Sequence, residues 1–314
     1  MNAILEVLQF KNYSAEPVSK ESKPFSQFKA NIPIMYPSIR KSYFALSLLI
    51  GGGADLCEAQ PPKEITNSIG MKLVLIPKGT FMMGAPFDES GAGNDEAQHK
   101  VTISNEYYLG INEVTQSQYE KVMGANPSVF NASQINGDSS MHPVENVSWV
   151  NAVAFCRKLS KLPEEKNAGR VYRLPTEAQW EFACRADSST MYYYGENPLR
   201  IIKYAWFRGN SREQTHPVEQ KIANAWGLYD MHGNVWEWCS DWYGEYPKDP
   251  VSDPTGPKEG DYKVIRSGSY DGDLAFCRSG KRGRFDPYLN FHNIGFRVAM
   301  SSWSGIPQSP EAEK

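Results

Sequence analysis

The sequence predicts an α+β fold with little regular secondary structure and long ordered loops. Three observations indicate this: helix start signals at three places, alternating apolar and polar segments, and 25 glycines with 21 prolines, which are typical of many turns. A single domain of about 200–250 residues plus tails fits the 314 residues, as would two small domains. The net charge of −3, with no long basic or acidic run, gives no electrostatic reason to expect nucleic acid as a partner.

A targeting signal is expected near the N-terminus. Two basic residues, Arg40 and Lys41, precede the apolar run Ser42–Ala54, and a small-residue site, Cys57–Ala59, follows it. These are the parts of a secretory signal peptide, although a buried hydrophobic segment is the alternative. The run is shorter than the roughly 20 residues of a membrane span, so no integral membrane protein is expected.

The signal sets the expected organisation of the chain. A start at Met35 would give it a basic region of ordinary length, so its core is placed at 35–59 of the extension 1–59. We expect an exported protein, either periplasmic, envelope-bound or secreted. After it we predict a linker at 60–69, one domain at 70–300 and a disordered tail at 301–314.

Strands are predicted at both ends of the domain. Residues 71–84 read as a strand broken by Pro77 and Gly79, with a hairpin plausible there. Residues 99–110 alternate, and the last strands are expected within 261–270 and 293–300.

Three helices have start signals. Thr115 with Gln118 and Thr176 with Gln179 form capping boxes, and Gly124 ends the first of these helices. The remaining helix is capped by Ser148. Its predicted inward stripe comprises Val150, Val153, Ala154, Leu159 and Leu162, and the aromatic residues Phe155, Trp180 and Phe182 are assigned to the core.

Regular structure thins out over residues 187–262. So long a loop region is either pinned by ions or disulfides or used as a binding surface. Beyond residue 59 the cysteines allow three pairings, which the sequence alone does not choose between, and no CxxC spacing supports a zinc or redox motif; they are Cys156, Cys184, Cys239 and Cys277.

Several segments together resemble one family. They are GMKLVLIPKGTFMMG, EVTQSQYEKVMG, PVENVSWVNAVAFC, YRLPTEAQWEFACRA, NAWGLYDMHGNVWEW, VIRSGSY and NIGFRVA. In this order they resemble the formylglycine-generating enzymes (sulfatase-modifying factors) and their bacterial relatives, over about residues 67–300. The resemblance implies a variant of the C-type-lectin-like fold.

The resemblance also implies an oxidase chemistry that this chain does not fully support. The family's oxidase converts a sulfatase cysteine to formylglycine with oxygen and Cu(I), which two soft thiolates five residues apart hold. Cys277 matches the second thiolate position, but Gly272 stands at the first. Copper binding is therefore doubtful, and whether the chain is an enzyme stays open. Ser269 and Trp236 match residues near the family's oxygen pocket, so the catalytic candidates are Cys277, Ser269 and Trp236.

Calcium is the cofactor that the resemblance supports better. The implied ligands are Asp230 and Glu237 through side chains and Gly233 and Val235 through main-chain carbonyls, which are hard oxygen donors suited to Ca²⁺. The alternative is a turn capped by Asp230 with Glu237 on the surface. A second family calcium site is expected to be missing, because Trp206 falls where it needs an asparagine.

The family's disulfides do not transfer to this chain. They start at positions matching Cys156 and Cys184, but their partner positions hold Val298 and Arg282. By the resemblance, any disulfide has to use Cys239 and Cys277.

Three functions remain. The first is an exported non-oxidase member that binds a peptide, a protein or a glycan, possibly a sulfatase. The second is a formylglycine-generating oxidoreductase, which retention of Ser269, Trp236 and Cys277 favours weakly. The third is a structural role in an envelope.

Overall fold

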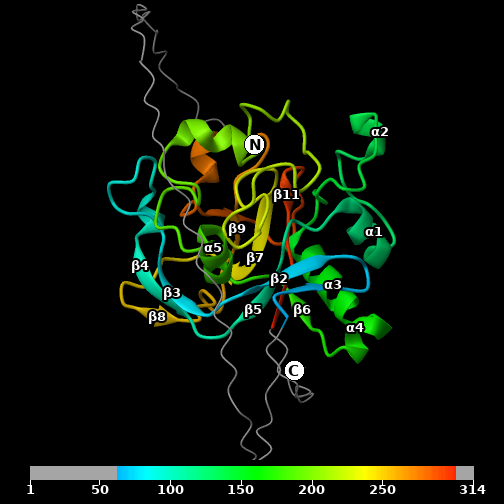
Figure 1. Ribbon diagram of the computed structural model, residues 1–314, viewed down its shortest axis with the longest axis horizontal. Coiled ribbons are helices and arrows are strands. Elements are labelled where there is room, and N and C mark those ends of the chain that lie inside the picture. Colours follow the sequence, from blue (N-terminus) through cyan, green and yellow to red (C-terminus); the bar gives the residue numbers. More distant parts are fainter. Residues whose placement is uncertain (1–61, 302–314) are drawn as a thin grey trace, which may run out of the picture. The chain divides into compact units, whose positions relative to one another are not determined.

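The computed structural model describes residues 62–301 (Figure 1). The predicted signal segment, its cleavage site near Gln60 and the tail from residue 302 lie outside the described residues. Within the described part of the chain, no helix is long and apolar enough to cross a membrane.

The first sheet joins the two ends of the domain. It has five antiparallel strands in the order β1-β2-β5-β12-β6. They are β1 Glu64–Thr66, β2 Lys72–Ile76, β5 Tyr107–Gly110, β12 Ala299–Ser301 and β6 Tyr172–Arg173. The prediction of a linker at 60–69 is wrong for β1, because this segment pairs with β2 and so belongs to the sheet.

Two smaller sheets complete the architecture. One has four strands, in the order β10 Gly283–Phe285, β9 Lys263–Arg266, β7 Trp236–Trp242 and β11 Ile294–Gly295. The other has three, in the order β3 Gly79–Met83, β4 His99–Ile103 and β8 Val251–Ser252. Two of these strands, β7 and β8, fall in the region 187–262 that was predicted to be loop-rich.

The hairpin prediction for residues 71–84 is wrong. The break at Pro77 and Gly79 is real, but β2 pairs with β1 and β5, whereas β3 pairs with β4 in another sheet. Gly79 packs so tightly on α5 that an added Cβ would lie 2.8 Å from Phe182 Cζ. The chain therefore changes sheets at this point instead of folding back on itself.

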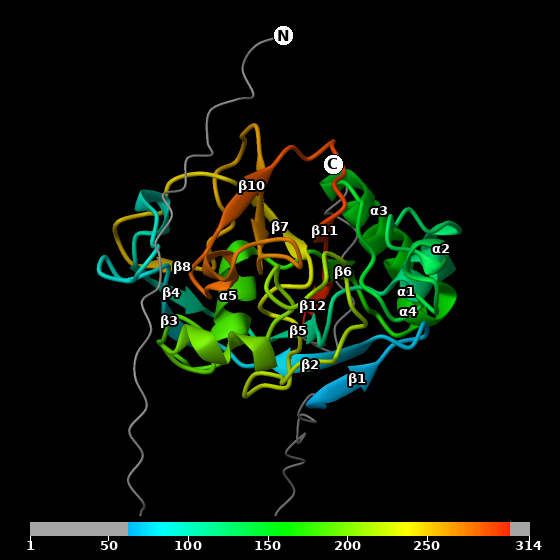
Figure 2. The ribbon, with the colours of Figure 1, turned by 90° about the horizontal axis from the view of Figure 1, so that it is seen from above.

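The three predicted helices, α1, α3 and α5, begin where their caps predict. The α-helices are α1 Gln116–Met123, α2 Ala132–Ile135, α3 Trp149–Ser160, α4 Pro163–Asn167 and α5 Glu177–Arg185, and short 3₁₀ turns are η1 Asn94–Glu96, η2 Pro198–Lys203 and η3 Leu274–Cys277. Both capping boxes form, and Gly124 ends α1 in the left-handed conformation. In Figures 1 and 2, α1 to α4 gather on one side of the molecule, opposite β3, β4 and β8, while α5 lies between them.

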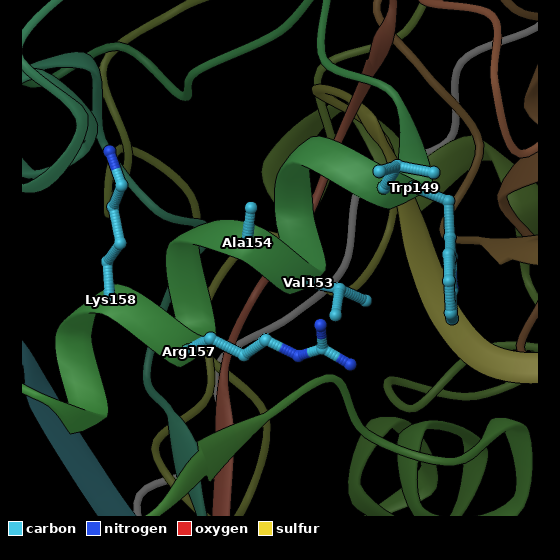
Figure 3. Close-up of a pocket in the computed structure, with 6 residues that line it drawn as sticks. Trp149, Val153, Ala154, Arg157 and Lys158 are labelled. Carbon is cyan, nitrogen blue, oxygen red and sulfur yellow. The ribbon is translucent and has the colours of Figure 1, made fainter.

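The predicted inward stripe of α3 is partly wrong. The buried residues are Ala152, Phe155, Cys156 and Leu159, whereas Val150 is 41% exposed. Both sets have helical spacing, so periodicity alone does not separate them. Val153 and Leu162 are half-buried and pack against the same core cluster, as predicted, whereas Ala154 is half-buried on the outer face (Figure 3).

The assigned aromatic residues do form the core. Phe155 packs under α3 with residues of the first sheet, and Trp180 and Phe182 pack around α5 in a second cluster. Phe155 and Trp180 have no exposed surface.

Candidate functional site

Cys277 lies at the end of η3 and is fully buried. Its neighbours in a small apolar cluster include Tyr192 and Ile201. Gly268, at φ +79°, passes so close that an added Cβ would lie 2.9 Å from Cys277 Sγ. Burial raises the pKa of the Cys277 thiol well above its usual range, so the group stays a neutral thiol. A soft metal needs the thiolate, which this environment disfavours.

The matching position, Gly272, offers no donor side chain. A Cβ there would lie 3.3 Å from Ser269 O and Oγ and 3.4 Å from Phe276 Cδ2. The Gly272 carbonyl accepts a hydrogen bond from the Arg208 amide at 3.0 Å. One buried neutral thiol beside a glycine does not fit the two-thiolate Cu(I) site that the resemblance implies.

The other two catalytic candidates, Ser269 and Trp236, are linked through Asn293. The Ser269 hydroxyl donates to Asp271 Oδ1 at 2.6 Å, and the Asn293 amide donates to the same atom at 2.9 Å. The half-buried Trp236 donates its main-chain N–H to Asn293 O. Sequence reasoning missed Asn293, because no local pattern links it to Ser269. This cluster is polar and hydrogen-bonded, with Phe276 standing beside Trp236 at 6.3 Å between ring centroids.

Asp230 is the predicted calcium ligand that best suits a cation. It is fully buried, and its Oδ2 accepts the Glu219 amide at 2.9 Å, but Oδ1 has no partner. Burial, outweighing the Glu219 amide, raises its pKa to about 6. An orphaned buried carboxylate oxygen fits a hard cation.

Glu237 has a different set of neighbours. Arg297 donates to both of its oxygens, at 2.6 and 2.7 Å, and Trp180 Nε1 donates to Oε2 at 2.8 Å. Glu237 is therefore neither free to bind a cation nor on the surface, as the alternative prediction had it.

The two main-chain positions lie in the same tight loop. Gly233 has a φ of +82°, and its carbonyl accepts from Ser267 Oγ at 3.0 Å. An added Cβ at Gly233 would lie 2.1 Å from Trp206 O, so only glycine fits here. Val235 is buried.

A further carboxylate, Glu113, was missed by the sequence reasoning. It is fully buried, and neither of its oxygens has a partner. Burial, followed by the charges of Asp230 and Glu237, raises its pKa well above the usual range. It stands two residues before the α1 cap, where a glutamate ordinarily faces solvent, so no sequence pattern predicts its burial. Among residues 62–301, no three His, Cys, Asp or Glu side chains form a metal-binding group.

None of the four described cysteines is paired. In particular, no disulfide joins Cys239 and Cys277, the two cysteines that the resemblance left for one. At the family's partner positions, Val298 packs in the same core cluster as Cys156, and Arg282 donates to buried Glu177 at 2.7 Å. Apolar packing and an ion pair stand where the resemblance would place sulfur bridges.

An apolar surface with basic edges lies on the outer face of α3. A cavity of about 330 Å³ opens there (Figure 3), lined by Trp149, Val150, Val153, Ala154, Arg157 and Lys158. The Val150 amide donates to Pro287 O, which brings the loop 286–292 alongside. In that loop Tyr288, Leu289 and Phe291 are 77%, 55% and 43% exposed. We call the cavity residues and these three loop residues the α3 surface.

Comparison with known proteins shows the family of the chain. The family model of the sulfatase-modifying factor enzyme 1-like domain matches residues 58–302. The chain belongs to this family. This sulfatase-modifying-factor-like protein is 27% identical over 308 residues to the chaperone protein LppX of Paenibacillus barcinonensis, covering 84% of this chain and 100% of the relative. It is 27% identical over 290 residues to the formylglycine-generating enzyme of Mus musculus, covering 73% and 74%.

Solved structures confirm the fold. Treponema denticola variable protein 1 superimposes with a TM-score of 0.69 and 30% identity, covering 76% of this chain and 99% of that one. The fold of this sulfatase-modifying-factor-like protein is thus the predicted α+β, C-type-lectin-like one.

Proposed function

We propose that this chain is an exported, non-oxidase member of its family that binds a protein partner through the α3 surface. One observation carries the first half of this proposal: Cys277 is buried as a neutral thiol, and Gly272 supplies no second one. A relative that aligns over its whole length bears the name of a chaperone protein, which supports a binding role.

The chemistry of the α3 surface favours a protein over a glycan. Its exposed side chains are mainly aliphatic and aromatic, with two cations at the edge, Arg157 and Lys158. A glycan needs many polar partners, which this surface does not offer. A protein segment with apolar side chains beside acidic ones would contact both the apolar residues and the two cations of this surface. We therefore expect a partner segment that is apolar and acidic; a segment of a sulfatase is one candidate.

Binding can be tested with a reduced, unfolded acidic client protein. The purified chain should bind it and slow its aggregation, and Val153→Glu with Arg157→Glu should weaken binding about tenfold or more, or about 1.4 kcal/mol. The control is Leu199→Glu, because Leu199 is 84% exposed on η2, away from α3. Equal binding by wild type and the double variant, or glycan-array binding without protein binding, would overturn the proposal.

Export is proposed on the basic, apolar and small-residue order of residues 40–59. N-terminal sequencing of protein recovered from the envelope fraction should begin near Gln60. A full-length product found in the cytoplasm would contradict export.

A further inference from the structure

A second cavity, of about 680 Å³, lies where strands of the three sheets meet the start of α5. Its lining comes from β4, β5, β6, β7 and β12 and from the cap and first turn of α5. The volume is that of a small-molecule site, and the lining mixes polar with apolar side chains. The cavity shares no lining residue with the α3 surface, and neither Ser269 nor Trp236 lines it.

Arg173 on β6 contributes a half-buried guanidinium to this cavity. Its Nη1 donates to two neutral acceptors, Leu174 O at 3.0 Å and Gln179 Oε1 at 2.8 Å. Among residues 62–301, no carboxylate forms an ion pair with it. In this it differs from the buried arginines, each of which pairs with a glutamate: Arg185, Arg266, Arg278, Arg282 and Arg297.

Asp241 is the carboxylate whose charge acts on Arg173, but it is engaged elsewhere. Its Oδ2 accepts from the Ser240 hydroxyl at 2.8 Å and from the Glu177 amide at 3.1 Å. Burial lowers the pKa of Arg173, because the charged guanidinium loses hydration there. A guanidinium nevertheless stays protonated in proteins. A charge that no described carboxylate pairs with therefore indicates an anionic group on the molecule that fills the cavity.

The opposite charge stands in another part of the same lining. Glu106, directly before β5, lines the cavity and forms no ion pair with a described residue. Asp253, the other carboxylate of the lining, is taken by Ser104, whose amide donates to Oδ1 at 2.9 Å and whose hydroxyl donates to Oδ2. A cation and a carboxylate that are not paired with each other complement a ligand that carries both charges.

The register of the first sheet sets the distance between these two charges. Arg173 pairs with Ala299, and Tyr107, the neighbour of Glu106, pairs with Ser301 on the same strand, β12. Two residues along β12 and two strand spacings across it place the Cα atoms of Arg173 and Tyr107 roughly 12 Å apart. The two charges of a single amino acid lie much closer together, whereas an extended tripeptide spans about 10 Å.

Two side-chain amides can meet the main chain of such a ligand. Gln179 Oε1 already accepts from Arg173 and, at 3.1 Å, from the Thr176 amide, so its amino group is the part left to donate. Asn105 Nδ2 donates to Ser104 Oγ at 2.8 Å, which leaves its carbonyl oxygen to accept. Both residues line the cavity, and one donor with one acceptor matches the C=O and N–H groups of a peptide.

We propose that this cavity binds a short peptide with free ends, about three residues long. Arg173 binds the C-terminal carboxylate, Glu106 binds the N-terminal ammonium, and Gln179 and Asn105 hydrogen-bond to the main chain between them. A phosphate or another dianion fits less well, because the carboxylates of Glu106 and Asp253 line the same space. The site is separate from the α3 surface, so the proposal does not depend on protein binding there.

Blocking the ends of the peptide tests each charged contact separately. The probes are trialanine and tripeptides with another central residue, each as the free peptide, the C-terminal amide and the N-acetyl form, titrated calorimetrically into the full chain. The tripeptide that binds best should lose about tenfold or more in affinity on amidation and on acetylation. In Arg173→Met the free and amidated peptides should bind equally, and in Glu106→Gln the free and acetylated peptides should.

Three further variants complete the test. Arg170→Met removes a guanidinium just before β6 but outside the lining, and Glu120→Gln removes an exposed carboxylate on α1; both should keep the wild-type preference for free ends. Thr255→Trp fills the cavity from an exposed position after β8, so it should abolish binding without lowering the melting temperature. This variant decides the question if Arg173→Met does not fold.

The proposal is overturned if no tripeptide binds wild type, if amidation leaves the affinity unchanged, or if Thr255→Trp binds as wild type does. It is equally overturned if a folded Arg173→Met still prefers the free carboxylate to the amide. Binding of glucuronate, which has a carboxylate but no ammonium, in place of the tripeptides would assign the cavity to acidic sugars and overturn the assignment of a peptide.

Discussion

At the scale of single residues, two glycines separate this chain from the oxidase that its family resemblance implies. Gly272 removes one thiol, and Gly268 allows the backbone to close over the other, Cys277. The missing thiol could be predicted from the sequence, because it is a matter of residue identity. The burial of Cys277 could not, because it depends on contacts with Tyr192 and Ile201, which are distant in sequence.

The copper chemistry gives a prediction at this scale. Gly272→Cys should raise Cu(I) affinity by about tenfold or more, or about 1.4 kcal/mol, because Cys277 is not in a disulfide and can become the second soft donor. Competition with a chromogenic Cu(I) chelator measures this. Adding Cys277→Ser should return the affinity to that of wild type, and an unchanged affinity in Gly272→Cys would show that the buried thiol cannot reach the new one.

At the scale of elements, local signals were predictable and pairing was not. Capping boxes are short-range, so the starts of α1 and α5 followed from Thr115 and Thr176. The partners of β2 and β3 are set by distant strands, so their sequence suggested a hairpin that does not form. The outer face of α3 was misassigned for a related reason: two stripes have helical spacing, and only packing chooses between them.

The cap of α5 provides a test at this scale. The Thr176 hydroxyl accepts from the Gln179 amide at 3.1 Å, and the Gln179 side chain accepts from the Thr176 amide at 3.1 Å. Thr176→Ala should lower the free energy of unfolding by about 1 kcal/mol, measured by denaturant titration. Thr80→Ala on β3, which loses one exposed contact to Thr102, should change it by about 0.5 kcal/mol or less. Equal losses in the two variants would argue against the cap.

At the scale of the whole molecule, buried ion pairs stand where the resemblance implies one of the disulfides and a calcium carboxylate. Glu237 on β7, Arg297 just before β12 and Trp180 on α5 form one network that connects distant parts of the chain. Each residue could be read from the sequence, but their convergence could not, because it depends on the tertiary fold. The orphaned oxygens of Glu113 beside this network are a property of the same kind.

Breaking this network should be costly. Arg297→Met leaves Glu237 as a buried, unpaired charge, so the free energy of unfolding should fall by about 3–5 kcal/mol in a denaturant titration. Arg170→Met is the control, because the Arg170 side chain is 26% exposed and pairs with Glu165 at 3.3 Å. That change should cost about 1 kcal/mol or less. A similar small loss in Arg297→Met would mean that the network contributes little to stability.

The most direct measurement of the central claim is an assay for aldehyde formation. Wild-type protein is incubated with Cu(I), oxygen and a sulfatase-derived cysteine peptide, and the peptide is analysed by mass spectrometry. Because the loop offers one buried neutral thiol and Gly272 in place of a second, the peptide should keep its cysteine. Aldehyde product that depends on the wild-type chain would contradict the non-oxidase assignment.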